Sequence, residues 1–259
     1  MNFEVIDFHT HPFYNHKNNF CFFQNVVNDY NEFKDDLINS GISKCCGSVI
    51  RRFVPESFSE VSELNEEAFK LSQLYDGFYI PGIHFHPAFV EQSIEELNKY
   101  SKLGVKLIGE ICPYLMGWKD YYTEEMDSIY KEADKLNMVV NFHSNVGNEL
   151  EQTIEKAIER FPNLIFVAAH PREKALLENH IERLKKYDNY FLDLSGTGIS
   201  RFGTLKHLVD SVGSEKILFG TDYPISNPKM YVEGVLFEKI TDRQKEDILS
   251  ANAKRILGL

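Results

Sequence analysis

Residues 3–11 read FEVIDFHTH, a run of apolar, aromatic and β-branched residues that ends in two histidines. Such a run is typical of a buried β-strand. Similar runs recur along the chain, at 43–50, 77–85, 104–111, 137–143, 163–170, 189–195 and 215–222. The sequence therefore predicts eight strands, and their starts lie on average about thirty residues apart, the length of one strand–helix unit.

The stretches between these runs have the spacing of helices. Residues 61–71 carry apolar side chains at the 3.6-residue period. Two helices are predicted to begin with a capping box, in which an N-cap hydroxyl and a side chain three residues later satisfy each other's backbone donors. These boxes pair Ser57 with Glu60 and Thr241 with Gln244.

Eight consecutive strand–helix units match the (β/α)8 barrel in number and in chain length, whereas doubly wound sheets usually have five or six strands. We therefore predict an α/β fold, a single (β/α)8 TIM barrel domain over residues 1–259. Such barrels place their chemistry at the carboxyl ends of the strands. The residues that follow each strand are therefore the first candidates for function.

The charge of the chain argues against some partners. It has 28 Lys+Arg against 39 Asp+Glu, a net charge of −11. This excess of acids disfavours nucleic acid or an anionic membrane as the main partner. No apolar run approaches the ~20 residues that span a bilayer, and the first residues lack a signal peptide's features, so we expect a cytoplasmic protein. The cysteines have no metal-type spacing and are expected to be reduced thiols: Cys21, Cys45, Cys46 and Cys112.

His9 and His11 form an HxH pair at the end of the first predicted strand. Because strand side chains alternate between two faces, Val5, Asp7, His9 and His11 are expected to share one face. Two imidazoles on one face can bind one metal ion. The pair also fits two ordinary polar residues at a strand end, since an isolated HxH is a weak motif.

Three further strand ends carry residues of the same kind. His143 ends the fifth strand, His170 the sixth and Asp222 the eighth. Alternation predicts that each continues a series pointing into the barrel: Val139, Asn141 and His143; Phe166, Ala168 and His170; Leu218, Gly220 and Asp222. Nitrogen and oxygen ligands that converge on one barrel mouth suit zinc, iron, manganese or nickel.

The ordered set of motifs covers nearly the whole chain: DFHTH (7–11), FHSN (142–145), AAHPRE (168–173), FGTDYP (219–224) and NAKRILGL (252–259). It resembles the amidohydrolase superfamily, specifically the amidohydrolase-related group that contains metal-dependent hydrolases and aminocarboxymuconate-semialdehyde-type decarboxylases. The resemblance implies a distorted (β/α)8 barrel with one or two divalent ions at its carboxyl mouth. It also implies the metal ligands His9, His11, His143 and Asp222, and makes His170 either a further ligand or a catalytic histidine.

Glu110, at the end of the fourth predicted strand, decides how many ions to expect. It resembles the glutamate that one branch of the superfamily places here as a metal ligand. The alternative is a glutamate that hydrogen-bonds within the mouth or faces a histidine. Lys106, four residues earlier, is expected on the same face. Our expected cofactor is Zn²⁺, with Mn²⁺, Fe²⁺ or Ni²⁺ as alternatives.

Two residues beside the predicted ligands have candidate supporting roles. Asp193 ends the seventh strand and could accept a hydrogen bond from a ligand imidazole, or simply form a turn. His86, in GIHFHP after the third strand, is a candidate substrate-side residue, or a hydrogen-bonded packing residue.

Arginines and aromatic residues near the strand ends suggest a substrate site. Guanidinium groups suit a carboxylate or phosphate, and Arg51 and Arg172 are our candidates, although each also fits a surface charge. Segments 12–23 and 112–122 are aromatic, and the second contains the candidate Trp118. They fit the walls of a small-molecule pocket, or a cover for the barrel end or a subunit contact, which leaves a homo-oligomer open.

These residues together predict a metal-dependent hydrolase. A metal-activated water would attack an amide, ester or related bond of a small, potentially anionic molecule. Asp222 would act as general base and then acid, and His170 would complete the coordination or stabilise the oxyanion. The first alternative is non-oxidative decarboxylation of a small unsaturated or aromatic acid, with His170 or Asp222 delivering a proton to carbon. The second is a non-catalytic barrel that binds a metabolite and keeps the ligand set as a relic.

Overall fold

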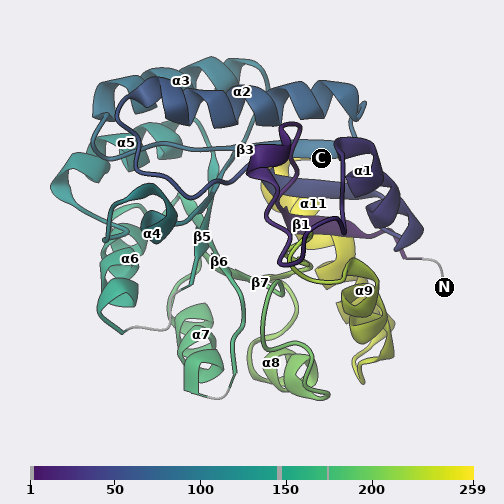
Figure 1. Cartoon of the computed structure of the whole chain (residues 1–259). Helices are drawn as coiled ribbons and strands as arrows, with labels where there is room; N and C mark the ends of the chain where they lie inside the picture. Colours follow the sequence, from purple (N-terminus) through teal and green to yellow (C-terminus); the bar gives the residue numbers. More distant parts are fainter. Residues whose placement is uncertain (1–2, 145–147, 174) are drawn as a thin grey trace.

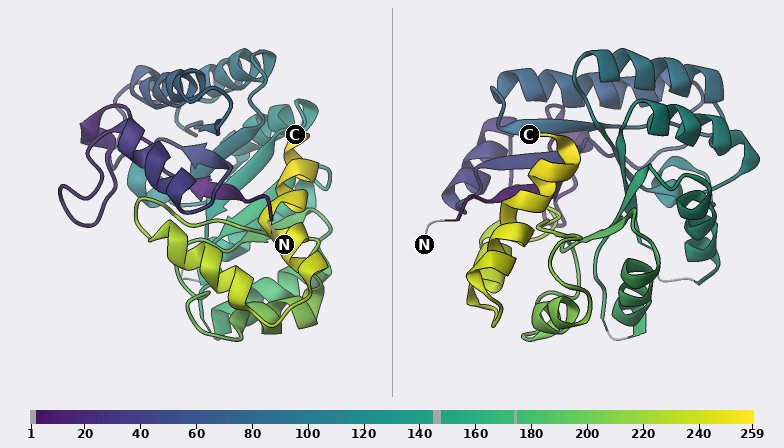
Figure 2. Two further views of the ribbon diagram at one scale, coloured as in Figure 1. Left: turned by 90° about the vertical axis from the view of Figure 1, so that its right-hand side faces the viewer. Right: turned by 180° about the vertical axis from the view of Figure 1, so that it is seen from behind.

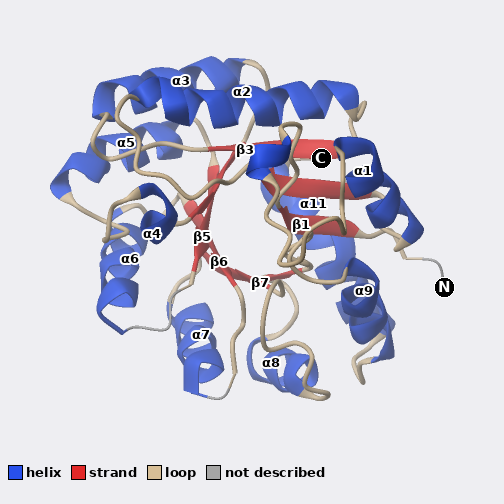
Figure 3. Cartoon of the chain, viewed as in Figure 1, coloured by secondary structure: helices blue, strands red, loops and turns tan. Residues whose placement is uncertain are grey.

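The computed structural model describes residues 3–144, 148–173 and 175–259, and its strands form the predicted (β/α)8 barrel. Parallel strands at the centre are surrounded by helices (Figure 1, and in red and blue in Figure 3). They pair in chain order: β1 (Ile6–Thr10), β2 (Lys44–Ser48), β3 (Tyr79–Ile83), β4 (Leu107–Ile111), β5 (Val139–His143), β6 (Ile165–Ala169), β7 (Tyr190–Asp193) and β8 (Ile217–Leu218). The barrel closes where the Phe8 N–H donates to the Phe219 carbonyl, at 2.8 Å.

Most helices follow the strands at the predicted places: α1 (Tyr30–Asn39), α2 (Phe58–Leu74), α3 (Val90–Lys102), α4 (Pro113–Met116), α5 (Glu124–Lys135), α6 (Asn148–Arg160), α7 (Ala175–Lys186), α8 (Thr204–Val212), α9 (Pro228–Phe237), α10 (Asp242–Glu246) and α11 (Asn252–Leu257), with the 3₁₀ helix η1 (His16–Asn18) and the π-helix η2 (Asp247–Ala251). The capping box at Thr241 is present. The one at Ser57 is wrong, because Glu60 instead accepts the backbone N–H of Glu56, at 2.7 Å. None of the described helices is long and apolar enough to span a bilayer.

The apolar core has two main layers. The inner layer takes side chains from all eight strands and from α11, among them Ile6, Cys46, Leu107, Val139, Val167, Phe191, Leu218 and Leu257. Figure 2 shows α11, in yellow, lying against the strands. The outer layer packs between the strands and the surrounding helices and includes Cys45, so Cys45 and Cys46 point to opposite faces of β2. All four cysteines are free thiols.

A β-bulge in the β1–β2 ladder changes the expected direction of the β1 side chains. Phe8 and His9 lie opposite the single residue Cys46. The prediction that Val5 shares a face with His9 is therefore wrong: Val5 packs in the outer layer, while Ile6 and Phe8 pack in the inner one. The extra residue in the bulge allows His9 to follow Phe8 to the inside of the barrel.

A second bulge gives Glu110 its place. Gly109 and Glu110 lie opposite the single residue Asn141 of β5. Gly109 has a φ of 93°, and a Cβ there would lie 2.2 Å from the Asn141 carbonyl oxygen, so only glycine fits. The expectation that Lys106 shares the face of Glu110 is wrong, because Lys106 is exposed and its ammonium lies beside Gly258, after α11.

The predicted inward series on β6 is also wrong. Phe166 and Ala168 pack in the outer layer and Val167 in the inner layer. His170 still reaches the mouth, because its backbone has a φ of 70° and turns away from the strand direction. Asp222, after β8, has a φ of 68°. Such left-handed residues cost about 1–3 kcal/mol each and cluster at functional sites.

Candidate metal centre

Side chains from the ends of β1 and β8 meet at the carboxyl mouth of the barrel. The Nε2 atoms of His9 and His11 lie 3.2 Å apart. Oδ1 of Asp222 lies 3.3 Å from His11 Nε2 and 3.7 Å from His9 Nε2. These three atoms lie within 4.8 Å of one another, and all three residues are buried. The spacing is that of ligands around one ion.

Glu110 joins this group to β6. Its Oε2 lies 3.5 Å from His11 Nε2 and 3.7 Å from His9 Nε2, and its Oε1 lies 3.3 Å from His170 Nε2. Burial raises the pKa of Glu110, but the imidazoles of His9 and His143 outweigh it and hold the pKa well below its usual range. The thiol of Cys112 also donates to Oε2, at 2.9 Å. Glu110 is therefore an ionised carboxylate at the centre of the mouth.

Three of the imidazoles at the mouth, His9, His11 and His170, use their outer nitrogen for a hydrogen bond. The partners of Nδ1 are Asp193 Oδ2 at 3.0 Å for His9, the Ser48 carbonyl at 3.1 Å for His11 and Ser195 Oγ at 3.0 Å for His170. A carboxylate or carbonyl oxygen can only accept, so Nδ1 carries the proton in the neutral rings of His9 and His11. Their Nε2 lone pairs then face the mouth, the arrangement of metal-ligating histidines.

The residues present fit a divalent cation. Imidazole nitrogens and carboxylate oxygens converge within 3.2–3.7 Å of one another, and buried lone pairs at such distances repel unless positive charge lies between them. Such a nitrogen and oxygen donor set suits zinc, manganese or iron. We call the imidazole and carboxylate groups of His9, His11, Glu110, His170 and Asp222 the mouth cluster.

The pKa values of His9 and His11 also indicate that the mouth lacks positive charge. Burial lowers the pKa of His9, but the carboxylates of Asp193, Glu110 and Asp222 outweigh it and raise the pKa to about 10. Burial likewise lowers the pKa of His11, and hydrogen bonds to Asp222 and Glu110 raise it to about 9. Without a metal ion, protons would supply the missing charge.

His143 is oriented differently from the other three histidines of the mouth. Arg172 Nη2 donates to its Nε2 at 3.1 Å, and its Nδ1 donates to Glu110 Oε1 at 2.9 Å. Burial lowers the pKa of His143, so the ring is neutral. Both ring nitrogens are therefore used. The resemblance implied that His143 is a ligand, and together with Glu110 and Cys112 it forms a further group that could hold a metal ion.

A cavity of about 690 Å³ opens beside the mouth cluster. His143, His170 and Asp222 line it on the side of the cluster. Aromatic and cationic side chains line it elsewhere, including Phe22, Tyr114, Arg52 and Arg172. Aromatic walls with a few convergent polar groups are typical of small-molecule sites.

Among the predicted substrate residues, only Arg172 lines this cavity. The guanidinium of Arg51 lies over the Phe53 ring, 4.2 Å from its centroid, and the neighbouring Arg52 lines the cavity instead. His86 is buried and packs edge-on against Trp118, with ring centroids 4.8 Å apart. Both lie outside the cavity wall, which uses Tyr114 from the same segment as Trp118. Asn145, at the end of the FHSN motif, lies outside the described residues.

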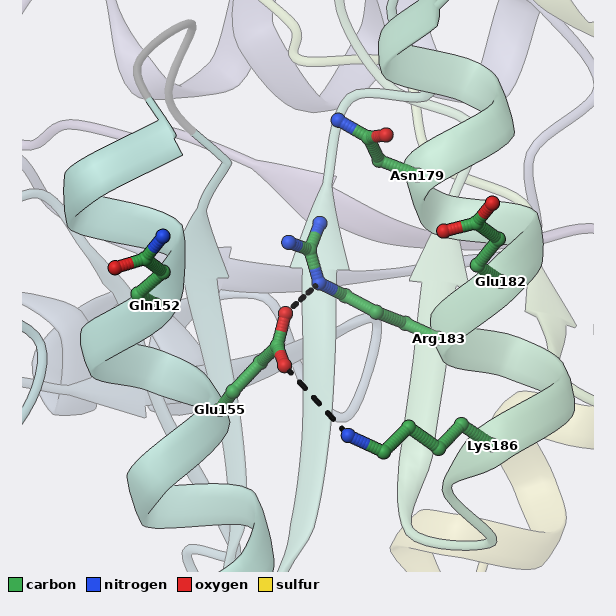
Figure 4. A pocket seen from close by; sticks show the side chains of 6 residues that line it. All are labelled: Gln152, Glu155, Asn179, Glu182, Arg183 and Lys186. Atoms are coloured by element: carbon green, nitrogen blue, oxygen red, sulfur yellow. Dashed lines mark hydrogen bonds and ion pairs between the residues drawn. The ribbon is translucent and has the colours of Figure 1, made fainter.

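A second depression lies on the outside of the barrel, between α6 and α7 (Figure 4). Arg183 Nε lies 2.9 Å from one carboxylate oxygen of Glu155, and Lys186 Nζ lies 3.9 Å from the other. We call this the α6–α7 groove. Both of its basic residues face the carboxylate of Glu155, so the groove differs from the mouth, where carboxylates and imidazoles converge.

Solved structures with the same fold include several enzymes. A 2,6-dihydroxybenzoate decarboxylase has a TM-score of 0.77 and 13% sequence identity, with 99% of each chain covered. A 5-carboxyvanillate decarboxylase from Novosphingobium aromaticivorans with bound manganese also has a TM-score of 0.77 and 13% identity, covering 99% of this chain and 97% of that one. A 4-oxalomesaconate hydratase from Rhodopseudomonas palustris has a TM-score of 0.71 and 16% identity, covering 98% and 95%.

A comparison with curated protein sequences found no match. The family model described as amidohydrolase matches residues 6–259, which include every residue of the mouth cluster. This match agrees with the barrel and with the buried histidine and carboxylate cluster at its carboxyl end. The chain therefore belongs to the amidohydrolase family, as the sequence motifs indicated.

Proposed function

We propose that this protein is a metal-dependent, non-oxidative decarboxylase of a small aromatic or unsaturated carboxylic acid. The observation that carries the proposal is the cavity, whose aromatic and arginine-bearing walls adjoin His170 and Asp222 of the mouth cluster. Two similar structures are decarboxylases of aromatic acids, one of them with manganese. The sequence alone favoured hydrolysis, and these neighbours favour its alternative. Because one fold hosts many reactions, the shared fold does not determine the substrate, and the proposal rests on the residues that line the cavity.

In this proposal the mouth cluster holds one divalent cation. The side chains of His143 and Asp193 and the backbone carbonyl of Ser48 hold its ligands in place. Zn²⁺ and Mn²⁺ are the two ions to test first, since the donor set suits both. When bound, the cation supplies a Lewis acid for an anionic oxygen of the substrate. His143 acts through Glu110, to which it donates a hydrogen bond.

The arginines of the cavity fit a negatively charged substrate. Arg52 is exposed, and its guanidinium lies 5.7 Å from the centroid of the Tyr114 ring. Arg172 donates to His143 and to the Ser144 carbonyl, while its Nε is buried and has no partner among the described atoms. A guanidinium binds a carboxylate through parallel hydrogen bonds. Two such groups beside aromatic rings suit a planar acid.

Decarboxylation breaks the bond between the carboxyl carbon and the neighbouring carbon, and the electron pair stays on that neighbouring carbon as CO2 leaves. A proton must then be delivered to it. Asp222 is placed for this step, because it belongs to the mouth cluster and also lines the cavity. His170 lines the cavity as well, but its Nε2 faces Glu110 at 3.3 Å. We therefore assign proton delivery to Asp222, which would take up the proton from solvent through the cavity and return to the carboxylate form once the carbon is protonated.

The test uses the full chain loaded with Mn²⁺ or Zn²⁺ and measures CO2 release from a panel of hydroxylated benzoates, with 2,6-dihydroxybenzoate and 5-carboxyvanillate as the first two. We expect release of CO2 by the wild type. Asp222→Asn should abolish it. Asp210→Asn, which changes an exposed aspartate of α8, is the matched control and should retain it.

Two other outcomes would overturn the proposal. Hydrolysis of ester or amide substrates without CO2 release would restore the hydrolase reading. Well under one metal ion per chain, with no activity after addition of Mn²⁺ or Zn²⁺, would favour the non-catalytic barrel.

A further inference from the structure

Asp193, at the end of β7, lies behind the mouth cluster and is fully buried. Its Oδ2 accepts from His9 Nδ1 and from Asn141 Nδ2, both at 3.0 Å. Its Oδ1 accepts from the backbone N–H of Ser195, at 3.0 Å, and from the Ser195 hydroxyl. A carboxylate offers about four lone-pair positions, so this one is fully used.

The hydroxyl of Ser195 connects the same carboxylate to a second imidazole. Both oxygens of Asp193 face donors, His9 and Asn141 at Oδ2 and the Ser195 backbone N–H at Oδ1, so the carboxylate meets the Ser195 hydroxyl as an acceptor. The Ser195 hydroxyl therefore donates its one hydrogen to Asp193. Toward His170 Nδ1, at 3.0 Å, the hydroxyl oxygen can only accept.

The glycine at position 196 leaves room for the contact between Ser195 and the His170 ring. A Cβ on Gly196 would lie 2.3 Å from Nδ1 of His170, so any other residue at this position would push the ring away. His170 itself has the left-handed φ of 70°. The absence of a side chain at Gly196 therefore lets the Nδ1 edge of the His170 ring lie against this loop, where Ser195 meets Nδ1.

We propose that Ser195 is a positioning residue that fixes His170 as the Nδ1–H tautomer, so that its Nε2 lone pair faces the cation. This inference rests on the proposed metal centre. Asp193 then orients two ligands of the mouth cluster, His9 directly and His170 through Ser195. A carboxylate that accepts a hydrogen bond from an imidazole makes that imidazole a stronger metal ligand. His9, which donates directly to Asp193, is therefore a stronger ligand than His170.

Ser195→Ala tests the proposal, and Ser48→Ala is its matched control. Ser48 is also a buried serine at the mouth, and its carbonyl accepts from His11, but its hydroxyl has no partner among the described atoms. The first measurement is the ¹⁵N NMR of labelled histidines in the metal-free protein, which distinguishes the two tautomers of a neutral ring. The second is the Kd of Zn²⁺ by competition with a chelator.

We expect wild type and S48A to show one tautomer of His170, and S195A to show a mixture. We also expect the Kd of Zn²⁺ to rise about tenfold in S195A, the lower end of the usual effect of removing a ligand's hydrogen-bond partner, and to stay unchanged in S48A. Ser195→Thr keeps the hydroxyl and should keep the single tautomer, whether or not S195A folds.

A single Nδ1–H tautomer in S195A, or a mixture in S195T, would overturn the inference. An equal change of Kd in S48A and S195A would do the same, because it would show a general disturbance of the mouth. If the wild type binds neither Zn²⁺ nor Mn²⁺, the proposed function fails, while the NMR of the metal-free protein still decides the role of Ser195.

Discussion

The mouth cluster and the α6–α7 groove both gather charged side chains in a depression, yet they differ in how the charges are matched. In the groove, Glu155 meets Arg183 and Lys186, and acid faces base. In the mouth, Glu110 and Asp222 surround imidazoles whose nitrogens already have their protein partners on the far side. Glu155 has its counter-charges within the groove, whereas the mouth lacks positive charge.

Burial sets the size of this difference. Exposed ion pairs contribute about 0–1 kcal/mol, because water competes for both partners. Buried charged groups without a matching partner are far more costly. A charged depression is therefore informative only where its charges are buried and unmatched, which is a property of the mouth cluster and not of the groove.

The largest expected effect comes from removing a mouth imidazole. His9→Ala should weaken Zn²⁺ binding by more than about a hundredfold, because loss of a mere hydrogen-bond partner of a ligand already costs about 10–100-fold. Metal per chain after dialysis, measured by mass spectrometry, checks this. The control is His207→Ala, which removes an exposed imidazole that lies 2.7 Å from Glu178 on the outer surface. Equal metal content in the two variants would contradict the comparison.

The lack of positive charge in the mouth should also make the stability of the metal-free protein depend on pH. The pKa values of His9 and His11 are raised from 6.5 to about 10 and about 9, so the folded metal-free protein holds these protons more tightly than the unfolded chain. Their stabilisation is complete below pH 6.5 and is lost as the pH rises through 9 and 10.

Urea unfolding of the metal-free protein should therefore show a falling midpoint between pH 7 and pH 10. Zn²⁺ should flatten this slope, because the cation replaces the protons. The H9A variant, lacking one of the two groups, should show a smaller slope than H207A. A wild-type midpoint that rises over this range would mean that the mouth does not demand positive charge.

A smaller effect is expected where the mouth meets the substrate. Arg52→Ala should raise KM about tenfold for an aromatic carboxylate, since a hydrogen bond to a charged group contributes about 1.5–3 kcal/mol. Arg51→Ala is the control, because the Arg51 guanidinium lies over Phe53 and outside the cavity. Steady-state kinetics decides between the two arginines. A larger change in R51A would move the substrate site to the other residue.

The smallest effect belongs to the groove. Glu155→Gln should lower the free energy of unfolding by no more than about 1 kcal/mol, as for other partly exposed ion pairs. Metal content and CO2 release should stay at the wild-type level. Chemical denaturation and metal analysis of this variant sharpen the comparison, and a loss of metal would show that the two regions are coupled.

Much of the site was predictable from residue types and their order. Except for the second strand, the end of each strand is marked by an abrupt change from apolar residues to a histidine or acid. The sequence therefore pointed to His9, His11, Glu110, His170 and Asp222, which the structure brings together. Arg52, Ser195 and Cys112 were not assigned roles in the site. Arg52 adjoins Arg51, and the sequence gives no reason to prefer either arginine for the substrate site. A serine or cysteine after a strand forms no sequence motif that indicates a role.

The sequence by itself determined the number of strand–helix units and the end of the barrel at which the polar residues gather, because hydrophobic periodicity and chain order are properties of the sequence. Only the tertiary structure decided how the ligands turn inward. Bulges at His9 and Glu110 and the left-handed backbone of His170 break the simple alternation of strands. The tertiary structure also gave two histidines different hydrogen-bond partners, Arg172 for His143 and Ser195 for His170, which come from other segments of the chain. A tautomer depends on which partner is close in space, and that proximity exists only after folding.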